Sequence, residues 1–396
     1  MNSIKKTEDY LKIDNKPKYF IFVCLLYLLI PIAYLLYRRK NNWLICERGN
    51  DAQDNGFFFY KYVRENHPEI NIVYLIKKNC KGYEKVFKLG KVVEYGSLKH
   101  FLMMIAYPVK ISSHLFGYSG WKNYTTYLRR HKTRDKHIFL QHGIIKNDHP
   151  GLYGPVTHLD LFVCGAKPEY EYIRDTFQYQ NNEVQYTGLP RYDDLNDFEC
   201  KSQILFMPTW RRELMGVSDE EFVKSDFYKN WNDLLNSSKL IDICSEKGLI
   251  IKFYLHYSLQ KYSHLFKSND VVKIINFSDE EVHDLLKDSN MLVTDFSSVY
   301  FDMAYMNKPI VYFQFDEETF NDEHYGKGYF DYRVNGFGPV INNSEDIEKN
   351  IVYLVNNYFT IDKDYVYRFE NVFLYHGKNC ERIFYSILNL IRKCYE

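Results

Sequence analysis

An aspartate and two adjacent serines lie between an apolar run and a helical pattern near residue 295. Residues 294–298 (TDFSS) form the turn, and the helical pattern begins near Val299. Ser297 or Ser298 can cap that helix, whose unbonded N–H groups and positive dipole end attract an anion. An ordinary N-cap accounts for one serine, but not for Asp295 with two hydroxyls beside it. The turn therefore predicts a phosphate-binding site, with capping alone as the alternative.

A histidine follows a second apolar run, in residues 138–148 (IFLQHGIIKND). His142 stands at the end of an expected strand, beside Gly143, which leaves room for a ligand. A histidine in this position can act as a general base, and the nearby Lys146 can neutralise phosphate charge. A purely structural histidine is the alternative.

Two further expected strand ends carry residues suited to phosphate chemistry. Residues 203–213 (QILFMPTWRRE) place Arg211 after an apolar run, and the planar guanidinium group matches phosphate oxygens. The alternative is a surface pair formed by Arg211 and Arg212. Residues 251–258 (IKFYLHYS) place His256 at another strand end, where it is a second candidate histidine.

Polar residues also crowd the first expected strand-to-helix loop, within residues 46–62 (CERGNDAQDNGFFFYKY). Five of them are candidates for binding the hydroxyl groups of an acceptor substrate: Glu47, Arg48, Asp51, Asp54 and Asn55. The alternative is an ordinary capping loop with Asp54 as the N-cap of the following helix. The loop has no GxGxxG pattern, so it lacks the dinucleotide-binding fingerprint.

Absent motifs and the charge balance exclude several classes of protein. The sequence has no GxxxxGK[ST], HExxH or GxSxG motif, which argues against an NTPase, a zinc protease and a serine hydrolase. It also has no DxD-type pair at a strand end, so we predict no required metal and no other cofactor. The 51 basic and 51 acidic residues leave no net charge, which is unlike a nucleic-acid-binding protein. The eight cysteines form no CxxC pair, and we expect reduced thiols.

The elements that must position these residues alternate along the chain as strand and helix. Two series of short apolar runs, which predict strands, are separated by a turn-rich boundary at residues 188–195 (GLPRYDDL). Helical patterns between the runs indicate parallel sheets, so we predict an α/β protein with two Rossmann-like doubly wound domains. The first series of expected strands is 43–47, 71–76, 91–95, 108–112, 137–141 and 160–164, and the second is 203–208, 249–256, 271–275, 290–294 and 309–315.

The predicted domains follow from these patterns. They are an N-terminal segment (1–42), an acceptor domain (43–195), a donor domain (196–345) and C-terminal helices that pack back onto a domain (346–396). Ligands of doubly wound folds bind at the carboxyl ends of the strands, so we expect an interdomain cleft to hold the chemistry.

The most apolar segment covers residues 19–37 (YFIFVCLLYLLIPIAYLLY), with basic residues on both sides. It is just long enough to span a bilayer, and Pro31 predicts a kink. No cleavage site for a signal peptide follows it. We predict a membrane-associating segment that either spans the bilayer or lies in its interface, with a buried helix of the first domain as the alternative.

Taken together, these motifs resemble the CDP-glycerol glycerophosphotransferase family, the teichoic acid and capsule polymerases of bacteria. The strongest match runs from Thr294 to Asp316 and on through residues 325–340. QHG (141–143), GLPRYD (188–193), PTWR (208–211) and GKNCERI (377–383) also match, so the resemblance covers most of residues 43–390.

The resemblance implies a GT-B architecture and transfer of glycerol phosphate from CDP-glycerol to a hydroxyl of a lipid-linked or capsular glycan or polyol-phosphate chain, with release of CMP. It also implies a membrane-associated enzyme on the cytoplasmic side of the cell membrane. By the same resemblance, His142 is the base and His256 stabilises the phosphate. The diphosphate is bound by Thr294, Asp295, Ser297, Ser298, Arg211 and Lys146.

Two positions depart from the family pattern. The family's lysine stands five residues after the histidine, whereas Lys146 stands four after His142. Tyr257 follows His256 where the family usually has proline. The alternatives are a CDP-ribitol ribitolphosphotransferase, a nucleotide-sugar glycosyltransferase of the same architecture, and a non-catalytic scaffold of a capsule assembly complex.

Overall fold

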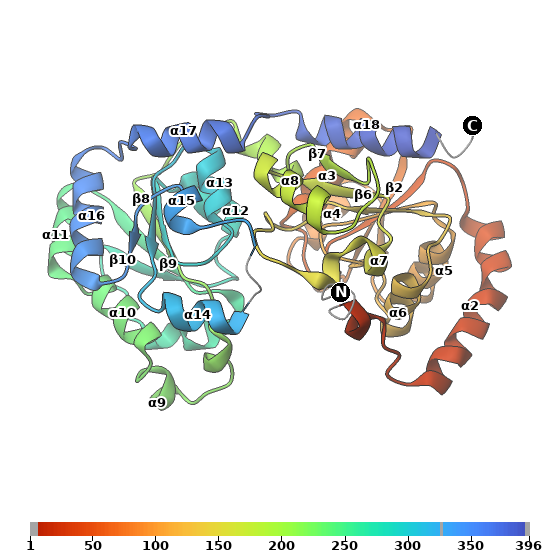
Figure 1. The fold of residues 1–396 in the computed structure, drawn as a ribbon, viewed down its shortest axis with the longest axis horizontal. Helices are drawn as coiled ribbons and strands as arrows, with labels where there is room; N and C mark the ends of the chain where they lie inside the picture. Colours follow the sequence, from red (N-terminus) through yellow and green to blue (C-terminus); the bar gives the residue numbers. More distant parts are fainter. Residues whose placement is uncertain (1–6, 325–327, 393–396) are drawn as a thin grey trace. The chain divides into compact units, whose positions relative to one another are not determined.

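The computed structural model describes residues 7–324 and 328–392, and the chain folds in it as two α/β units (Figure 1). Unit 1 comprises Met1–Ile144, His149–Asp194 and Phe373–Glu396, and unit 2 comprises Ile145–Asp148 and Leu195–Val372. The predicted fold class, two Rossmann-like doubly wound parallel sheets, is confirmed. Residues 325–327, which open the second part of the family-like stretch, lie outside the described residues, as do the first six and last four residues of the chain.

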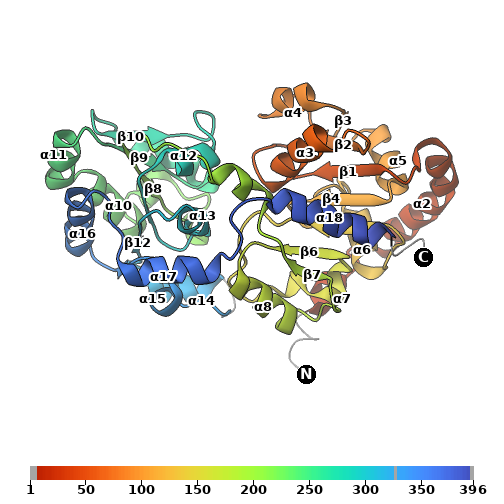
Figure 2. The ribbon, with the colours of Figure 1, turned by 90° about the horizontal axis from the view of Figure 1, so that it is seen from above.

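Unit 1 contains a seven-stranded parallel sheet with the order β3-β2-β1-β4-β5-β6-β7. Its strands are β1 (Asn42–Cys46), β2 (Asn71–Ile76), β3 (Val92–Glu94), β4 (Val109–Ser112), β5 (Lys136–Phe139), β6 (Leu161–Cys164) and β7 (Val184–Tyr186). Its helices are η1 (Asp9–Leu11), α2 (Lys16–Tyr37), α3 (Asn55–Asn66), α4 (Tyr83–Leu89), α5 (Leu98–Ala106), α6 (Lys122–Arg130), η2 (Pro150–Leu152), α7 (Gly154–Thr157), α8 (Lys167–Thr176) and α18 (Asn379–Arg392). The C-terminal α18 packs beside α3 on one face of this sheet (Figure 2).

Unit 2 contains a six-stranded parallel sheet with the order β10-β9-β8-β11-β12-β13. Its strands are β8 (Gln203–Met207), β9 (Ile250–Tyr254), β10 (Val272–Ile275), β11 (Met291–Thr294), β12 (Ile310–Phe313) and β13 (Val340–Ile341). Its helices are η4 (Arg212–Leu214), α9 (Asp219–Phe222), α10 (Asp226–Leu235), α11 (Ser238–Glu246), η5 (Tyr257–Leu265), α12 (Val282–Asp288), α13 (Tyr300–Tyr305), α14 (Glu317–His324), α15 (Tyr332–Asn335), α16 (Ser344–Asn356) and α17 (Lys363–Val372). The short η3 (Pro190–Leu195) lies where unit 1 ends and unit 2 begins.

Several central strands are buried along their whole length because helices cover both faces of each sheet. All five residues of β1 and of β8 are buried, and so are all four of β11 and of β12. Such strands read as continuous apolar runs, which explains why the sequence predicted them. The partly buried edge strands β3 and β10 were also predicted. The sequence analysis missed the strands β7 and β13, which have three and two residues.

Strand order places the switch in winding direction between β1 and β4 in unit 1 and between β8 and β11 in unit 2. Ligands of doubly wound sheets bind beyond the carboxyl ends of strands at such a point. The polar motifs of the sequence follow β1, β5, β8 and β11, so the topology brings them to these edges.

The apolar helix α2 packs along the flank of unit 1, beside α5 and α6 (Figure 1). Tyr19, Leu26 and Ala33, each seven residues apart, are its buried residues. Its opposite face is apolar and exposed, through Phe20, Ile21, Leu25, Tyr27, Leu28, Ile32, Leu35 and Leu36. Immediately after the helix, Arg38 bonds Asp135 at 2.9 Å, and Asp135 also accepts from the buried Lys110 at 2.6 Å. The end of α2 is therefore fixed to the sheet.

Candidate active site

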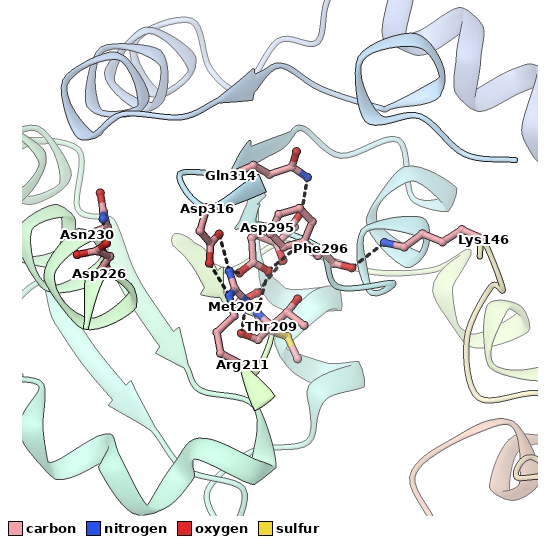
Figure 3. Close-up of polar contacts among 11 residues, drawn as sticks. Lys146, Met207, Thr209, Arg211, Asp226, Asn230, Asp295, Phe296, Gln314 and Asp316 are labelled. Carbon is pink, nitrogen blue, oxygen red and sulfur yellow. Dashed lines mark hydrogen bonds and ion pairs between the residues drawn. The ribbon is translucent and has the colours of Figure 1, made fainter. Parts of the chain in front are cut away.

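A buried arginine in unit 2 joins the turns that follow three neighbouring strands (Figure 3). Arg211, after β8, donates to both carboxylate oxygens of Asp316, which follows β12, at 2.7 and 3.0 Å. It also donates to Asp295, which follows β11, at 2.8 Å, and to the carbonyl oxygen of Thr209 at 2.8 Å. The two carboxylates raise the pKa of Arg211, against the opposing effect of burial. This Arg211–Asp295–Asp316 cluster therefore holds the three turns in one arrangement.

The same contacts show how Asp295 and Arg211, two predicted diphosphate-binding residues, are bonded within the protein. Besides Arg211, Asp295 accepts hydrogen bonds from the backbone N–H groups of Thr209 at 2.8 Å and Phe296 at 2.6 Å. Both charged side chains are almost fully buried and are bonded within the protein. We interpret them as groups that shape the turn, rather than as direct ligands of a phosphate.

The hydroxyl groups of the TDFSS turn have different surroundings. Thr294 is buried and donates to the carbonyl oxygen of Met207 at 2.7 Å. Ser297 and Ser298 are half-buried, and Ser297 accepts from the N–H of Val299 at 3.4 Å. The prediction that one of these serines caps the next helix is wrong, because Val299 is the N-cap of α13 and provides no side-chain bond. Within the part of the chain that the structure describes, the Ser298 hydroxyl has no protein partner and is available to a ligand.

Lys146 reaches this turn, because residues 145–148 pack with unit 2. Its ammonium group donates to the carbonyl oxygen of Phe296 at 2.6 Å and to the Tyr332 hydroxyl, and it lies over the rings of Tyr300 and Tyr332 (Figure 3 shows the Phe296 bond). Burial lowers the pKa of Lys146 to about 7, although the negative charge of Asp295 opposes the shift. A new anion beside it would raise that pKa again.

In unit 1, the His142 side chain is exposed and follows β5. Its ring stacks on His114, which follows β4, with centroids 4.8 Å apart and planes 14° from parallel. Among the described residues, neither ring nitrogen of His142 has a hydrogen-bond partner. The pKa of His142 is lowered to about 4, first because the nearby protein desolvates the ring. Electrostatic repulsion from Arg191, Arg48 and His149 lowers it further. The ring is therefore neutral at pH 7 and can accept a proton.

The first loop of unit 1 is a capping loop, as the alternative interpretation predicted. Glu47 is buried and accepts from the N–H groups of Gln53, Asp54 and Phe57 at 2.9 to 3.1 Å. Asp54 is the N-cap of α3, and it also pairs with Arg191 at 2.9 Å. The buried Asn55 donates to the carbonyl oxygen of Gln141 at 2.8 Å. Three of the five predicted acceptor residues thus build the loop.

The two other predicted acceptor residues, Arg48 and Asp51, form an ion pair with each other at 2.5 Å. The Arg48 side chain is 56% exposed, whereas Asp51 is buried. Of the five candidates, Arg48 is therefore the one that remains open to an acceptor.

His256 lies in unit 2 after β9, where it is the N-cap of η5. Its Nδ1 accepts from the N–H of Ser258 at 3.2 Å, and its ring centroid is 6.1 Å from that of Trp210. Because Nδ1 accepts a hydrogen bond, the proton of the neutral ring lies on Nε2. The Nε2–H group can therefore donate a hydrogen bond to a ligand. Across residues 7–324 and 328–392, no three His, Cys, Asp or Glu side chains gather as a metal site.

Sequence reasoning missed Arg191 and His114. The carboxyl end of an expected strand, at residues 108–112, was the available signal for His114. For Arg191 the signal was the GLPRYD turn, which was interpreted only as a boundary and a family motif. The contacts of both residues join segments far apart in the sequence.

We predict that Arg211→Met lowers the free energy of unfolding by about 3–5 kcal/mol, because Asp295 then loses its buried counter-charge. Urea denaturation followed by circular dichroism measures this change. Arg212→Met is the matched control, since Arg212 is exposed, and it should change stability by less than about 0.5 kcal/mol. Equal effects of the two variants would contradict a structural role of the cluster.

Comparison with known proteins supports an assignment to a family. A family model described as CDP-Glycerol:Poly(glycerophosphate) glycerophosphotransferase matches residues 29–389. The chain is 31% identical over 391 residues to the minor teichoic acid biosynthesis protein GgaB of Bacillus subtilis (strain 168), which covers 95% of this chain but only 43% of that relative. It is 27% identical over 374 residues to the teichoic acid glycerol-phosphate transferase of Staphylococcus aureus (strain NCTC 8325 / PS 47), covering 86% of this chain and 90% of that relative.

Solved structures show the same fold. The wall teichoic acid polymerase TagF superposes with a TM-score of 0.66 at 16% identity, over 99% of this chain and 97% of that chain. The fold is therefore GT-B-like, as the resemblance implied. With the family model matched over residues 29–389, the chain belongs to the CDP-glycerol:poly(glycerophosphate) glycerophosphotransferase family.

Proposed function

We propose that this protein transfers glycerol phosphate from CDP-glycerol to a hydroxyl of a cell-surface glycan or polyol-phosphate chain, in teichoic acid or capsule synthesis, and releases CMP. The family match over residues 29–389 carries this proposal. A relative covered over 90% of its length is named a teichoic acid glycerol-phosphate transferase. A variant of the TagF polymerase, whose fold this chain shares, has been solved with CDPG.

The proposed reaction is a single displacement at phosphorus. The acceptor hydroxyl oxygen forms a bond to the β-phosphorus of CDP-glycerol, while the bond from that phosphorus to the bridging oxygen breaks. The electron pair leaves with the bridging oxygen as CMP, and the hydroxyl proton passes to His142. Positioning and charge stabilisation supply most of the catalysis in such transfers. The acceptor loop of unit 1 contributes Arg48, the exposed member of its pair with Asp51.

The diphosphate is assigned to the TDFSS turn, with the Ser298 hydroxyl and the Lys146 ammonium group as its ligands. His142 and Lys146 are four residues apart in the chain, which limits the distance between their Cα atoms to about 14 Å. The chain therefore joins the base to Lys146, which is itself hydrogen-bonded to the carbonyl oxygen of Phe296 in the donor turn. His256, with its proton on Nε2, is assigned to the transferring phosphate.

The central test is CMP release by purified protein given CDP-glycerol or CDP-ribitol separately, each with a lipid-linked glycan acceptor. Release from CDP-glycerol alone supports the proposal, and release from CDP-ribitol alone selects the ribitol alternative. Release from neither, in folded protein, points to a nucleotide-sugar donor or to a scaffold.

We predict that His142→Ala lowers kcat by about 100-fold or more and leaves the Kd of CDP-glycerol within about twofold, because only proton removal is lost. Steady-state CMP release and calorimetric titration of the donor measure the two quantities. His131→Ala, at the exposed residue that follows α6, is the matched control, and it should leave both unchanged. Ordinary turnover by His142→Ala would remove this residue from the mechanism.

For the donor turn, Ser298→Ala should weaken CDP-glycerol binding by about 1–3 kcal/mol, since a charged oxygen loses a hydrogen-bond donor. Ser202→Ala, at an exposed position outside the turn, serves as the control in the same titration. A donor Kd that is identical in Ser298→Ala and the unaltered protein would rule out this hydroxyl as a ligand.

The affinity for CDP-glycerol should fall as the pH rises through about 7. The reason is the lowered pKa of Lys146, whose charged form predominates below that pH and binds the diphosphate. Lys146→Met should bind the donor weakly at every pH and lose most of this dependence between pH 6 and 9. A pH dependence that persists in Lys146→Met would assign it to another group.

We also propose that the protein acts on the cytoplasmic side of the membrane and that α2 lies in the membrane interface rather than spanning it. One face of the helix packs on unit 1, and the opposite face is apolar and exposed. Lys16 and Lys18 lie in its first turn, and Arg39 and Lys40 follow it, with no acidic residue between them. A helix with these features suits an anionic lipid surface.

The expected outcome is binding to phosphatidylglycerol vesicles that falls at high salt. The double variant Leu28→Glu, Leu35→Glu should lower binding at least about tenfold, because both leucines lie on the exposed face. The control is Tyr358→Glu with Tyr367→Glu, which changes exposed side chains of unit 2. Cysteines placed at residues 14 and 40 should both react with an impermeant maleimide added outside the vesicles. Protection of one of them would mean that α2 spans the bilayer.

A further inference from the structure

The orientation of the His142 ring needs an explanation, because the ring is exposed and has no hydrogen bond to any described residue. A general base must be held close to its working geometry, since small displacements are costly in rate. The protein therefore has to orient this ring through its backbone and its faces.

The backbone on both sides of His142 is held by hydrogen bonds. Asn55 donates to the carbonyl oxygen of Gln141 at 2.8 Å, and Arg191 donates to the carbonyl oxygen of His142 at 2.9 Å. Asn55 also accepts from the N–H of Arg191 at 3.1 Å, so the two anchors are bonded to each other. Two consecutive carbonyl groups are thus fixed by one connected pair of side chains.

The backbone at Gln141 is strained, which shows how firmly this segment is held. Gln141 has a φ of +61°, in the left-handed region that costs a non-glycine residue about 1–3 kcal/mol. Its side-chain amide donates to the carbonyl oxygen of Val163 at 2.5 Å. Such a conformation persists only where the surroundings impose it, and here it sets the direction in which His142 leaves the chain.

The face of the His142 ring is held by His114. The two rings are almost parallel, and Nδ1 of His114 lies 3.2 Å from the Ser113 hydroxyl. Burial and the neighbouring charges lower the pKa of His114 to about 2, so this ring is neutral. A neutral stacked ring offers a flat apolar surface but takes no proton from its neighbour.

We propose that Arg191 and His114 are positioning residues for His142, with Arg191 fixing its backbone and His114 fixing the plane of its ring. This inference rests on the proposed function, in which His142 is the base. The GLPRYD turn, which contains Arg191, would then position His142 in addition to linking the two units along the chain.

The charge of Arg191 adds a second, separable effect. The charged and titratable groups that face His142 are Arg191, Arg48, His149 and His114. Asp54 pairs with Arg191, and Asp51 pairs with Arg48. The two arginines favour the neutral ring, so removing the Arg191 charge should raise the pKa of His142.

Four variants separate these effects. Arg191→Lys keeps the charge but loses the guanidinium geometry, whereas Arg191→Met loses both. His114→Phe keeps a flat ring for stacking, whereas His114→Ala removes it. Arg174→Met, at an exposed site on α8, is the matched control. Circular dichroism melting checks that each variant is folded.

Two readouts are measured for each variant. The first is kcat and KM for CDP-glycerol. The second is the pH midpoint of His142 modification by diethyl pyrocarbonate, followed by peptide mass spectrometry, which needs no substrate.

We expect Arg191→Lys, Arg191→Met and His114→Ala to lower kcat by about 10- to 100-fold with little change in KM, and His114→Phe to recover most of the loss. Only Arg191→Met should also raise the modification midpoint, by about one pH unit. Unchanged kcat in Arg191→Met and His114→Ala would overturn the proposal, and so would a loss confined to KM. Equal loss in His114→Phe and His114→Ala would overturn the stacking role.

If the unaltered protein releases no CMP, the proposed function fails. The modification midpoints in wild type and Arg191→Met still report whether Arg191 acts on His142. The two failures are therefore distinguishable.

Discussion

A parallel sheet covered by helices on both faces leaves the ends of its strands as the place for chemistry. The central strands β1, β8 and β11 are buried throughout, so their side chains serve packing. The polar groups that follow β1, β4, β5, β8, β11 and β12 are released from that requirement. Because parallel strands share one direction, these groups gather at one edge of each sheet. His142 after β5 and the TDFSS turn after β11 both follow from this constraint.

Gathering polar groups at an edge creates a second problem, because several become buried there with their charges. In each unit a buried arginine neutralises these buried charges. Arg211 neutralises Asp295 and Asp316 and joins three turns, while Arg191 neutralises Asp54 and holds the carbonyl group of His142. Guanidinium groups suit this task because they donate in several fixed directions at once. These arginines position the TDFSS turn and His142, the groups to which the proposed function assigns the substrates.

The strands and their ends can be predicted from the sequence, because a buried parallel strand is an apolar run and polar residues mark its end. The sequence therefore predicted both sheets and the positions of His142, His256 and the TDFSS turn. It could not reveal that Arg211 and Asp295 satisfy each other, since their pairing joins positions 84 residues apart. The same limit hid the contact of Arg191 with His142, 49 residues away. The prediction of a serine N-cap was wrong about where the helix starts, because α13 begins at Tyr300 with Val299 as its N-cap.

His142 and Lys146 both have lowered pKa values, but only Lys146 changes its charge near pH 7. The pKa of His142 is about 4, so its neutral form is present throughout the physiological range, although such a ring is a weak base. The pKa of Lys146 is about 7, so its charge depends on the pH and on what binds beside it. In the proposed reaction the negative charge of the diphosphate raises the pKa of Lys146. The donor thus completes the site, and pH acts mainly on donor binding rather than on the availability of the base.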